Sequence, residues 1–152
     1  MGGRRGIVRK PRKRRRKGPL TLAKEKLWAV TRLLVFKTYG SDCFTCPRKN
    51  LKGSDRHGGH VPWASSELST PCRYDVRYIR AQCYDCNMNK NGCGAEAFKK
   101  MVLQGTDVDL MWNLNKEMKG KVYTLEQVKA LTESYKQLLN ERGANESPPS
   151  GD

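Results

Sequence analysis

The chain has 152 residues, and its 30 lysines and arginines against 15 acidic residues give a formal charge of +15. This length allows one domain with tails. No apolar stretch approaches the ~20 residues that a membrane-spanning helix needs, so the composition excludes an integral membrane protein and predicts a soluble one.

The positive charge is concentrated near the N-terminus. The segment from Arg4 to Lys17 holds ten basic residues and no acid, whereas residues 19–152 carry a net charge of only +5. Because this segment has glycines and almost nothing apolar, we predict a disordered basic arm over residues 1–19. Such arms neutralise phosphates, although a solvated tail, a contact with acidic lipids or a nuclear import signal are alternatives. The predicted nucleic-acid contacts in the arm are Arg12, Lys13, Arg14, Arg15, Arg16 and Lys17.

The segment from Leu20 to Tyr39 has the apolar spacing of a helix. Thr21 is a candidate N-cap, and Gly40 should end the helix. Since apolar residues recur on more than one side, we expect this helix to pack on two faces or to form a dimer seam.

Two Cys-x-x-Cys turns, Cys43–Cys46 and Cys83–Cys86, follow this helix and are the strongest motif in the chain. Each turn can bring two sulfurs to one ion at about 2.3 Å, so the pair predicts a structural zinc site. Disulfides are the alternative, but no signal peptide precedes the motif, which favours a reducing compartment. Cys72 and Cys93 fit no paired spacing and are expected to be ordinary thiols.

The 36 residues between the two turns contain both histidines of the chain, His57 and His60. Glycines and Pro62 exclude a helix here, and we predict a hairpin of two short strands within residues 56–63. A further short strand is expected over residues 74–81, leading into the second cysteine turn, and a helix over residues 95–101.

The C-terminal part is predicted to be helical. A helix is expected over residues 108–118, and Thr124 with Gln127 forms a capping-box candidate that opens a helix through Arg142, before Gly143. This last helix is amphipathic, so it either covers the core or pairs with a second copy. Residues 143–152 should be a disordered tail.

Several of these motifs occur together in one known family. The run His57-Gly-Gly-His60, the stretch Arg73-Tyr-Asp-Val-Arg-Tyr-Ile-Arg-Ala-Gln-Cys83 and the pair Cys86-Asn87 resemble the phage recombination nucleases called NinG or Rap, over roughly residues 20–142. More widely, the order resembles that of the HNH or ββα-metal endonucleases, including phage endonuclease VII. His60 and Asn87 match the catalytic histidine and the asparagine after the fourth cysteine. Position 59 is glycine, where many HNH nucleases have an aspartate.

The resemblance implies a specific fold and site. The fold would be α+β, with a zinc-stapled ββα-metal core in residues 20–142 and flanking N- and C-terminal helices. His60 would be the general base, with an ordinary pKa near working pH. Asn87 would bind a catalytic magnesium or manganese ion, with His57 or Asp55 supplying the donor missing at Gly59. Arg73 or Arg77 would hold a phosphate oxygen.

Two functions from different classes follow. The first is a metal-dependent endonuclease of branched recombination DNA, such as Holliday junctions, which would suit a homodimer in the cytoplasm of a bacterial host cell if the chain is of phage origin. The second is a non-catalytic, zinc-stapled nucleic-acid-binding protein, in which His57 and His60 are turn histidines or alternative zinc ligands.

Overall fold

The computed structural model describes residues 16–144. In this part of the chain the fold is α+β, as predicted. The helices are α1 (Pro19–Tyr39), α2 (Thr70–Arg73), α3 (Gly94–Leu103), α4 (Val108–Glu117) and α5 (Leu125–Ala144), and the strands are β1 (His57–His60) and β2 (Ile79–Gln82). Short 3-10 turns cover Gly53–Asp55, Val76–Tyr78 and Asn91–Cys93, and a π-helical turn covers Asp85–Asn89. Arg12, Lys13, Arg14 and Arg15 of the predicted arm, and residues 145–152 of the predicted tail, lie outside the described residues.

Helix α1 begins and ends at residues with special backbone preferences. Pro19 occupies its first turn, where the missing amide hydrogen costs nothing, so the N-cap is Gly18 and the predicted cap at Thr21 is wrong. Gly40, with φ of 82°, ends the helix in a region of backbone space that other residues rarely adopt. The predicted helix over residues 20–39 is therefore confirmed.

The two strands form one antiparallel sheet in which His57 lies opposite Gln82, and His60 opposite Ile79. The hairpin predicted within residues 56–63 is wrong, because the partner of β1 lies beyond a connection of 18 residues. The strand predicted over residues 74–81 begins only at Ile79, since the Asp75 carboxylate accepts the Arg77 amide and closes a 3-10 turn there.

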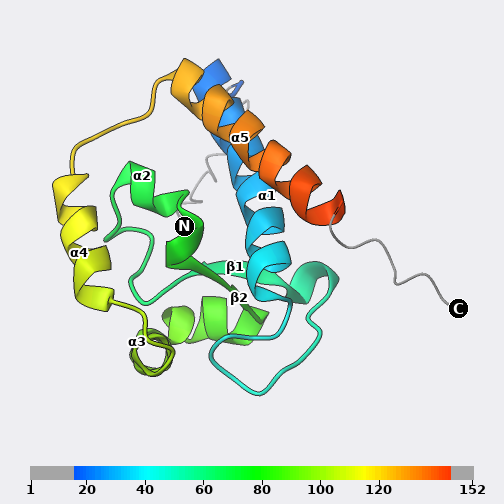
Figure 1. Ribbon diagram of the computed structural model, residues 1–152, viewed down its shortest axis with the longest axis vertical. Coiled ribbons are helices and arrows are strands. Elements are labelled where there is room, and N and C mark those ends of the chain that lie inside the picture. The colour runs from blue at the N-terminus through cyan, green and yellow to red at the C-terminus, as the bar shows by residue number, and fades with distance from the viewer. Residues whose placement is uncertain (1–15, 145–152) are drawn as a thin grey trace, which may run out of the picture.

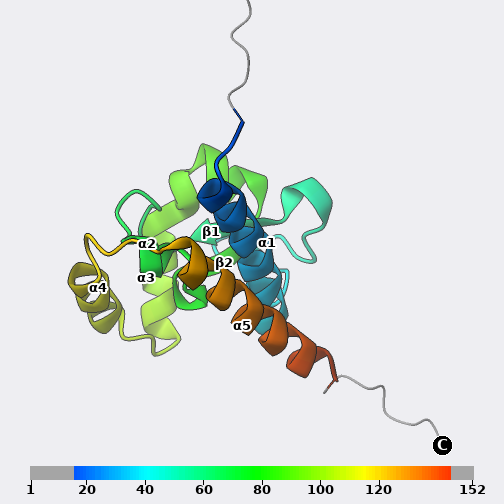
Figure 2. The ribbon, with the colours of Figure 1, turned by 90° about the horizontal axis from the view of Figure 1, so that it is seen from above.

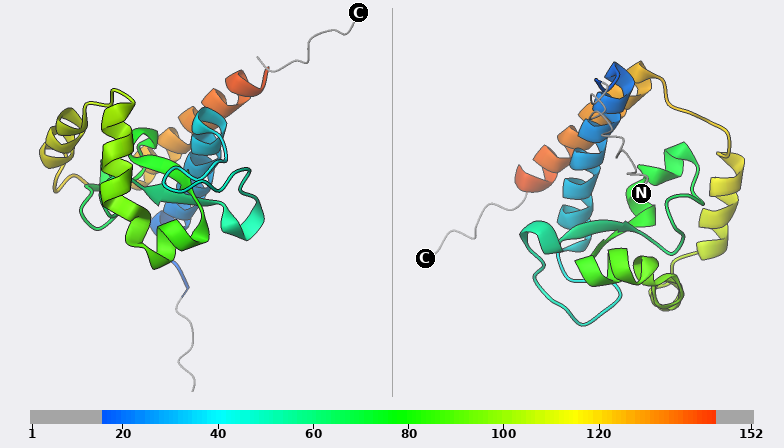
Figure 3. Two further views of the ribbon diagram at one scale, coloured as in Figure 1. Left: turned by 90° about the horizontal axis from the view of Figure 1, so that it is seen from below. Right: turned by 180° about the vertical axis from the view of Figure 1, so that it is seen from behind.

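The two faces of β1 meet different parts of the molecule. A Cβ atom at Gly58 would lie 3.0 Å from a side chain of α1, whereas one at Gly59 would lie 2.8 Å from Asn87 Oδ1. Since strand side chains alternate, His60 shares the face of Gly58, and His57 that of Gly59. Figures 1 and 3 show this division, with α1 on one side of the sheet and the segment of residues 85–103 on the other.

The main core lies between the short helices α2, α3 and α4 and the segment that carries Tyr78. Tyr78 is fully buried, and its hydroxyl donates a 2.6 Å hydrogen bond to the Met111 carbonyl oxygen of α4. The buried residues of this core are Phe44, Val61, Leu68, Cys72, Tyr78, Ala97, Met101, Val108 and Met111. The core holds α3 and α4 against the loop that connects β1 to β2.

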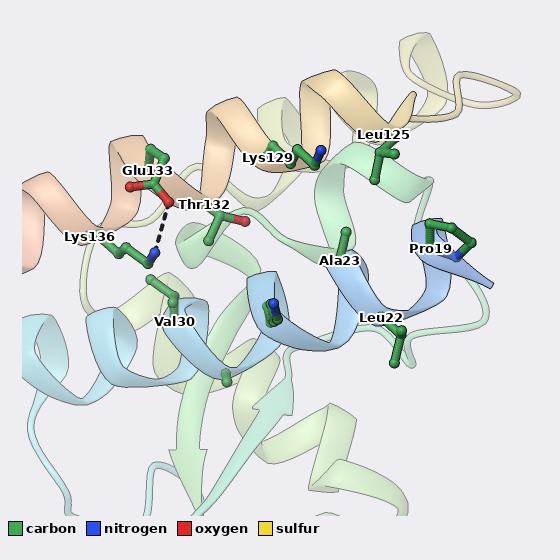
Figure 4. Close-up of a pocket in the computed structure, with 11 residues that line it drawn as sticks. Pro19, Leu22, Ala23, Val30, Leu125, Lys129, Thr132, Glu133 and Lys136 are labelled. Atoms are coloured by element: carbon green, nitrogen blue, oxygen red, sulfur yellow. Dashed lines mark hydrogen bonds and ion pairs between the residues drawn. The ribbon is translucent and has the colours of Figure 1, made fainter. Parts of the chain in front are cut away.

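Helix α5 lies alongside α1 (Figures 1 and 2). The predicted capping box is confirmed: Gln127 Oε1 accepts the Thr124 amide at 2.9 Å, and Thr124 Oγ1 accepts the Gln127 amide at 3.2 Å. The helix continues past Gly143 to Ala144, so the predicted stop is wrong. Its contact with α1 makes it a cover for the core, the first of the two predicted alternatives. A groove of about 610 Å³ remains between the two helices. Figure 4 shows the side chains that line it.

None of the helices within residues 16–144 combines the length and the apolar character needed to cross a bilayer.

Candidate functional site

Four cysteine sulfurs from the two predicted turns meet at one point. The Sγ atoms of Cys43, Cys46, Cys83 and Cys86 all lie within 4.8 Å of one another, and those of Cys46 and Cys83 are 3.8 Å apart. Tetrahedral zinc with bonds of about 2.3 Å requires sulfurs about 3.8 Å apart. The four residues predicted from the sequence are therefore positioned to hold a metal ion such as zinc.

Backbone amides surround these sulfurs. The Cys83 amide donates to Cys43 Sγ at 3.3 Å, and the Cys86 amide donates to Cys83 Sγ at 3.5 Å. Burial works to raise the pKa of Cys43, but the amide hydrogen bonds outweigh it and lower the pKa to about 6. Burial raises the pKa values of Cys46 and Cys86. A bound cation is therefore needed to stabilise the thiolate forms of these two cysteines.

The two remaining cysteines are not part of this group. Cys72 is buried in the main core, and Cys93 packs against the edge of the cluster with its Sγ 3.9 Å from the Cys86 carbonyl oxygen. Both positions agree with the prediction that they are ordinary thiols.

Asn87 is held beside the cluster by the backbone and by His57. Its backbone amide donates to the Cys83 carbonyl oxygen at 3.0 Å, and its side-chain Nδ2 lies 3.1 Å from His57 Nδ1. His57 Nε2 lies 2.9 Å from the Ser54 carbonyl oxygen, which can only accept, so Nε2 carries the proton and Nδ1 accepts from Asn87. This chain of hydrogen bonds fixes the carboxamide with Oδ1 turned away from His57.

The buried side-chain oxygen of Gln82, a residue with no predicted role, faces the same space. Gln82 is fully buried, and its Nε2 donates to the Gly92 carbonyl oxygen at 2.7 Å and to Thr45 Oγ1 at 3.2 Å. These donations fix the orientation of the amide, and Gln82 Oε1 has no hydrogen-bond partner among residues 16–144. The only sequence signal was its position directly before Cys83.

Gly59 leaves room between these two oxygens. A Cβ atom at position 59 would lie 1.9 Å from Gln82 Oε1 and 2.8 Å from Asn87 Oδ1, so the two oxygens are at most 4.7 Å apart, the sum of these distances. Oxygen ligands of an octahedral magnesium ion are spaced about 2.9–4.2 Å apart. The two carbonyl oxygens therefore share one space that the absent side chain at Gly59 leaves open, and the limit on their separation is compatible with this spacing.

His60 is fixed on the other face of β1. Its Nε2 lies 2.9 Å from the Arg73 carbonyl oxygen, and its ring stacks on Trp28 with centroids 5.2 Å apart. Because the carbonyl only accepts, Nε2 is protonated and Nδ1 keeps its lone pair. Burial, aided by the charge of Arg73 and opposed by this hydrogen bond, lowers the pKa of His60. Burial thus disfavours the charged form of the ring, and Nδ1 is its basic nitrogen.

The structure shows which of the predicted site residues contact one another. Asn87 contacts His57 rather than His60, because positions 57 and 60 of a strand point to opposite faces. The Nδ1 lone pair of His57 accepts from Asn87 and positions the carboxamide, whereas the ligand role of His57 stays a prediction. Asp55, the other predicted donor, accepts the Tyr84 amide at 3.0 Å and so caps the second cysteine turn.

The predicted phosphate-binding arginines have other partners. Arg77 forms an ion pair of 2.6 Å with Asp75, which raises the pKa of the arginine, and Arg73 Nε donates to the Leu68 carbonyl oxygen. In the arm, Arg16 is exposed, and Lys17 pairs with Glu25. The contacts of Arg73 and Arg77 with a phosphate thus stay a prediction, and in the structure both guanidinium groups bond protein oxygens.

No protein-family model matches the chain, and no curated protein or solved structure matches it.

Proposed function

We propose that this protein is a divalent-metal-dependent endonuclease that hydrolyses phosphodiester bonds in branched DNA. The observation that carries the proposal is the arrangement around Gly59. A carboxamide oxygen next to the cysteine cluster and an unpartnered buried oxygen face one space there, and the oriented imidazole of His60 lies on the opposite face of the same strand.

The protein would have a structural metal site and a catalytic one. The four cysteines would hold zinc, which would fix the turn that carries Asn87. Asn87 Oδ1 and Gln82 Oε1 would hold magnesium or manganese, since neutral hard oxygens suit these ions. When bound, such an ion would stabilise the negative charge that develops at the phosphate and its leaving oxygen. Because both protein ligands are neutral, we expect weak binding until the phosphate of the DNA adds its charge.

His60 would act as the general base. With the scissile phosphate lying across β1 at Gly59, where the strand has no side chain, the Nδ1 lone pair would accept a proton from the attacking water. The Arg73 carbonyl oxygen at Nε2 would stabilise the imidazolium that results. Stacking on Trp28 would limit rotation of the ring. His57 would take no proton and would keep the Asn87 carboxamide in place.

The substrate class rests on charge and on the family resemblance. The net charge of +15 favours a polyanion, and the ten basic residues between Arg4 and Lys17 would bind phosphates away from the reacting bond. The resemblance of the motifs to phage recombination nucleases favours branched DNA, where two copies of the chain would cut opposing strands.

The test is a cleavage assay with purified, zinc-loaded protein on a labelled four-way junction and on a linear duplex of the same sequence. We expect cuts in the junction with magnesium or manganese and none with a chelator of these ions. Binding of the junction without cleavage in either metal would contradict the proposal and would leave the non-catalytic nucleic-acid-binding protein.

The basic arm should control the salt dependence of binding. Removal of residues 1–15 deletes eight basic residues but spares Pro19 at the start of α1. The slope of log binding constant against log salt should then flatten by about 0.9 for each DNA phosphate that the shortened protein no longer neutralises. Fluorescence anisotropy with a labelled junction measures this slope, and replacement of the same basic residues by glutamine separates charge from length. An unchanged slope would exclude the arm from DNA binding.

A further inference from the structure

A second candidate site lies at the outer edge of β1. A cavity of about 390 Å³ is lined there by Trp28, Arg32, Gly53, Ser54, Arg56, His57, Gly58 and Asn87. In the described part of the chain β1 pairs only with β2, so this edge of the strand is free. The cavity therefore joins the position of Asn87 to the surface of α1.

Arg32 lines this cavity and carries an unsatisfied donor. Its Nε is buried and has no hydrogen-bond partner within residues 16–144, while one terminal nitrogen donates to the Arg56 carbonyl oxygen at 3.2 Å. The stem of Arg32 lies against Gly58, where a Cβ atom would be 3.0 Å from Arg32 Cγ. A buried N–H without a partner costs free energy that an anion in the cavity would recover.

Arg56 adds a second positive charge. Its guanidinium carbon lies 4.3 Å from the centroid of the Phe36 ring, and that of Arg32 lies 5.8 Å from the same ring. Arg56 also donates to Ser41 Oγ at 3.2 Å. Among the ion pairs of residues 16–144, no carboxylate pairs with either arginine. Two guanidinium groups on one ring without a counter-charge form a site for an anion.

The backbone of β1 supplies a further donor. The Val61 amide donates to the Tyr78 carbonyl oxygen, so positions 57, 59 and 61 form the hydrogen-bonded pairs of the ladder. By the alternation of an antiparallel pair, the Gly58 amide points to the free edge. Gly58 lines the cavity and has no side chain to cover this amide.

We infer that this cavity binds one phosphate group of the DNA strand, held by the guanidinium groups of Arg32 and Arg56 and by the Gly58 amide. The inference rests on the proposed function and assigns to Arg32 and Arg56 the role that the sequence suggested for Arg73 and Arg77. The bound phosphodiester lies beside Asn87, where its charge completes the weak site of the divalent cation.

Two measurements test this site, with Arg32→Gln, Arg32→Lys and the control Lys116→Gln, which removes one exposed positive charge from α4. The first is single-turnover cleavage of the four-way junction. Arg32→Gln should lower the rate at least tenfold, Arg32→Lys should restore part of it, and Lys116→Gln should change it less than twofold. Thermal melting of each variant checks that it remains folded. Where the wild type cuts the junction, equal rates for Arg32→Gln and Lys116→Gln would overturn the inference.

The second measurement does not depend on cleavage. The Nε–H signal of Arg32 in a proton–nitrogen correlation spectrum, assigned by its loss in Arg32→Lys, should shift when the dinucleotide thymidylyl-thymidine is added. A signal that does not move would overturn the inference. If the wild-type protein cuts no DNA but the signal shifts, the proposed function fails while the phosphate site stands.

Discussion

Substitution of His60 by alanine should reduce cleavage of a four-way junction by roughly 10²–10⁴-fold, the usual contribution of a general base. The expected loss follows from the lone pair at Nδ1, which is available because Nε2 donates to the Arg73 carbonyl oxygen. Binding should change little, since the neutral ring makes no charged contact with DNA. Single-turnover cleavage and anisotropy binding, measured on the same preparation, separate the two effects.

The matched control is His57→Gln. Glutamine can accept a hydrogen bond from Asn87 through its side-chain oxygen, so this variant should retain much more activity than His60→Ala. Unchanged cleavage in His60→Ala would remove His60 from the mechanism.

The pH dependence of cleavage should report the same residue. The base acts in its neutral form, so the rate falls as pH decreases through its pKa. Burial lowers the pKa of His60, and the acid limb of kcat/KM should therefore lie below 6.5, the ordinary imidazole value. Trp28→Ala, which exposes the His60 ring to solvent, should move this limb to higher pH.

Loss of zinc should unfold most of the protein. Structural zinc contributes on the order of 10 kcal/mol to folding, which is comparable to the whole stability of a typical small domain. The cluster joins the loop after α1 to the turn after β2. Within residues 16–144 it is the only group of cysteine, histidine and acidic side chains positioned to hold a metal ion. Cys83→Ser or a strong chelator should therefore remove the link that the metal makes between these two segments. Circular dichroism should detect loss of helix, and a zinc-sensitive dye should detect the released metal.

Cys72→Ala serves as the control for this experiment, because Cys72 is a buried thiol of the main core outside the cluster. It should keep its zinc and should melt only slightly below the wild type. A Cys83→Ser protein that is zinc-free yet fully folded would contradict the structural role of the metal.

The parts of the fold that were predictable depend on local chemistry. The helix over residues 20–39 ends at Gly40, and the capping box at Thr124 opens α5, because glycine and hydrogen-bonding caps act on their own neighbours. The cysteine cluster was predictable because two sulfurs on one short turn have few other geometries for sharing an ion.

The parts that were not predictable depend on contacts distant in the sequence. Nothing near His57 indicates that its strand pairs with residues 79–82, and a local hairpin satisfied the same turn signals. Once this pairing is known, strand alternation places His57 with Asn87 and His60 with Trp28. The free oxygen of Gln82 was likewise hidden, since it depends on where the Gly92 carbonyl lies.

The most direct test of the zinc-organised nuclease site is single-turnover cleavage of a labelled four-way junction by the wild type and by Asn87→Ala, with manganese present and protein in excess. Asn87 contributes an oxygen to the proposed divalent site without taking part in the cysteine cluster. We predict that the wild type cuts the junction and that Asn87→Ala, bound with similar affinity, cuts it at least a hundredfold more slowly. Equal cleavage by the two proteins, or a wild type that binds without cutting, would contradict the account.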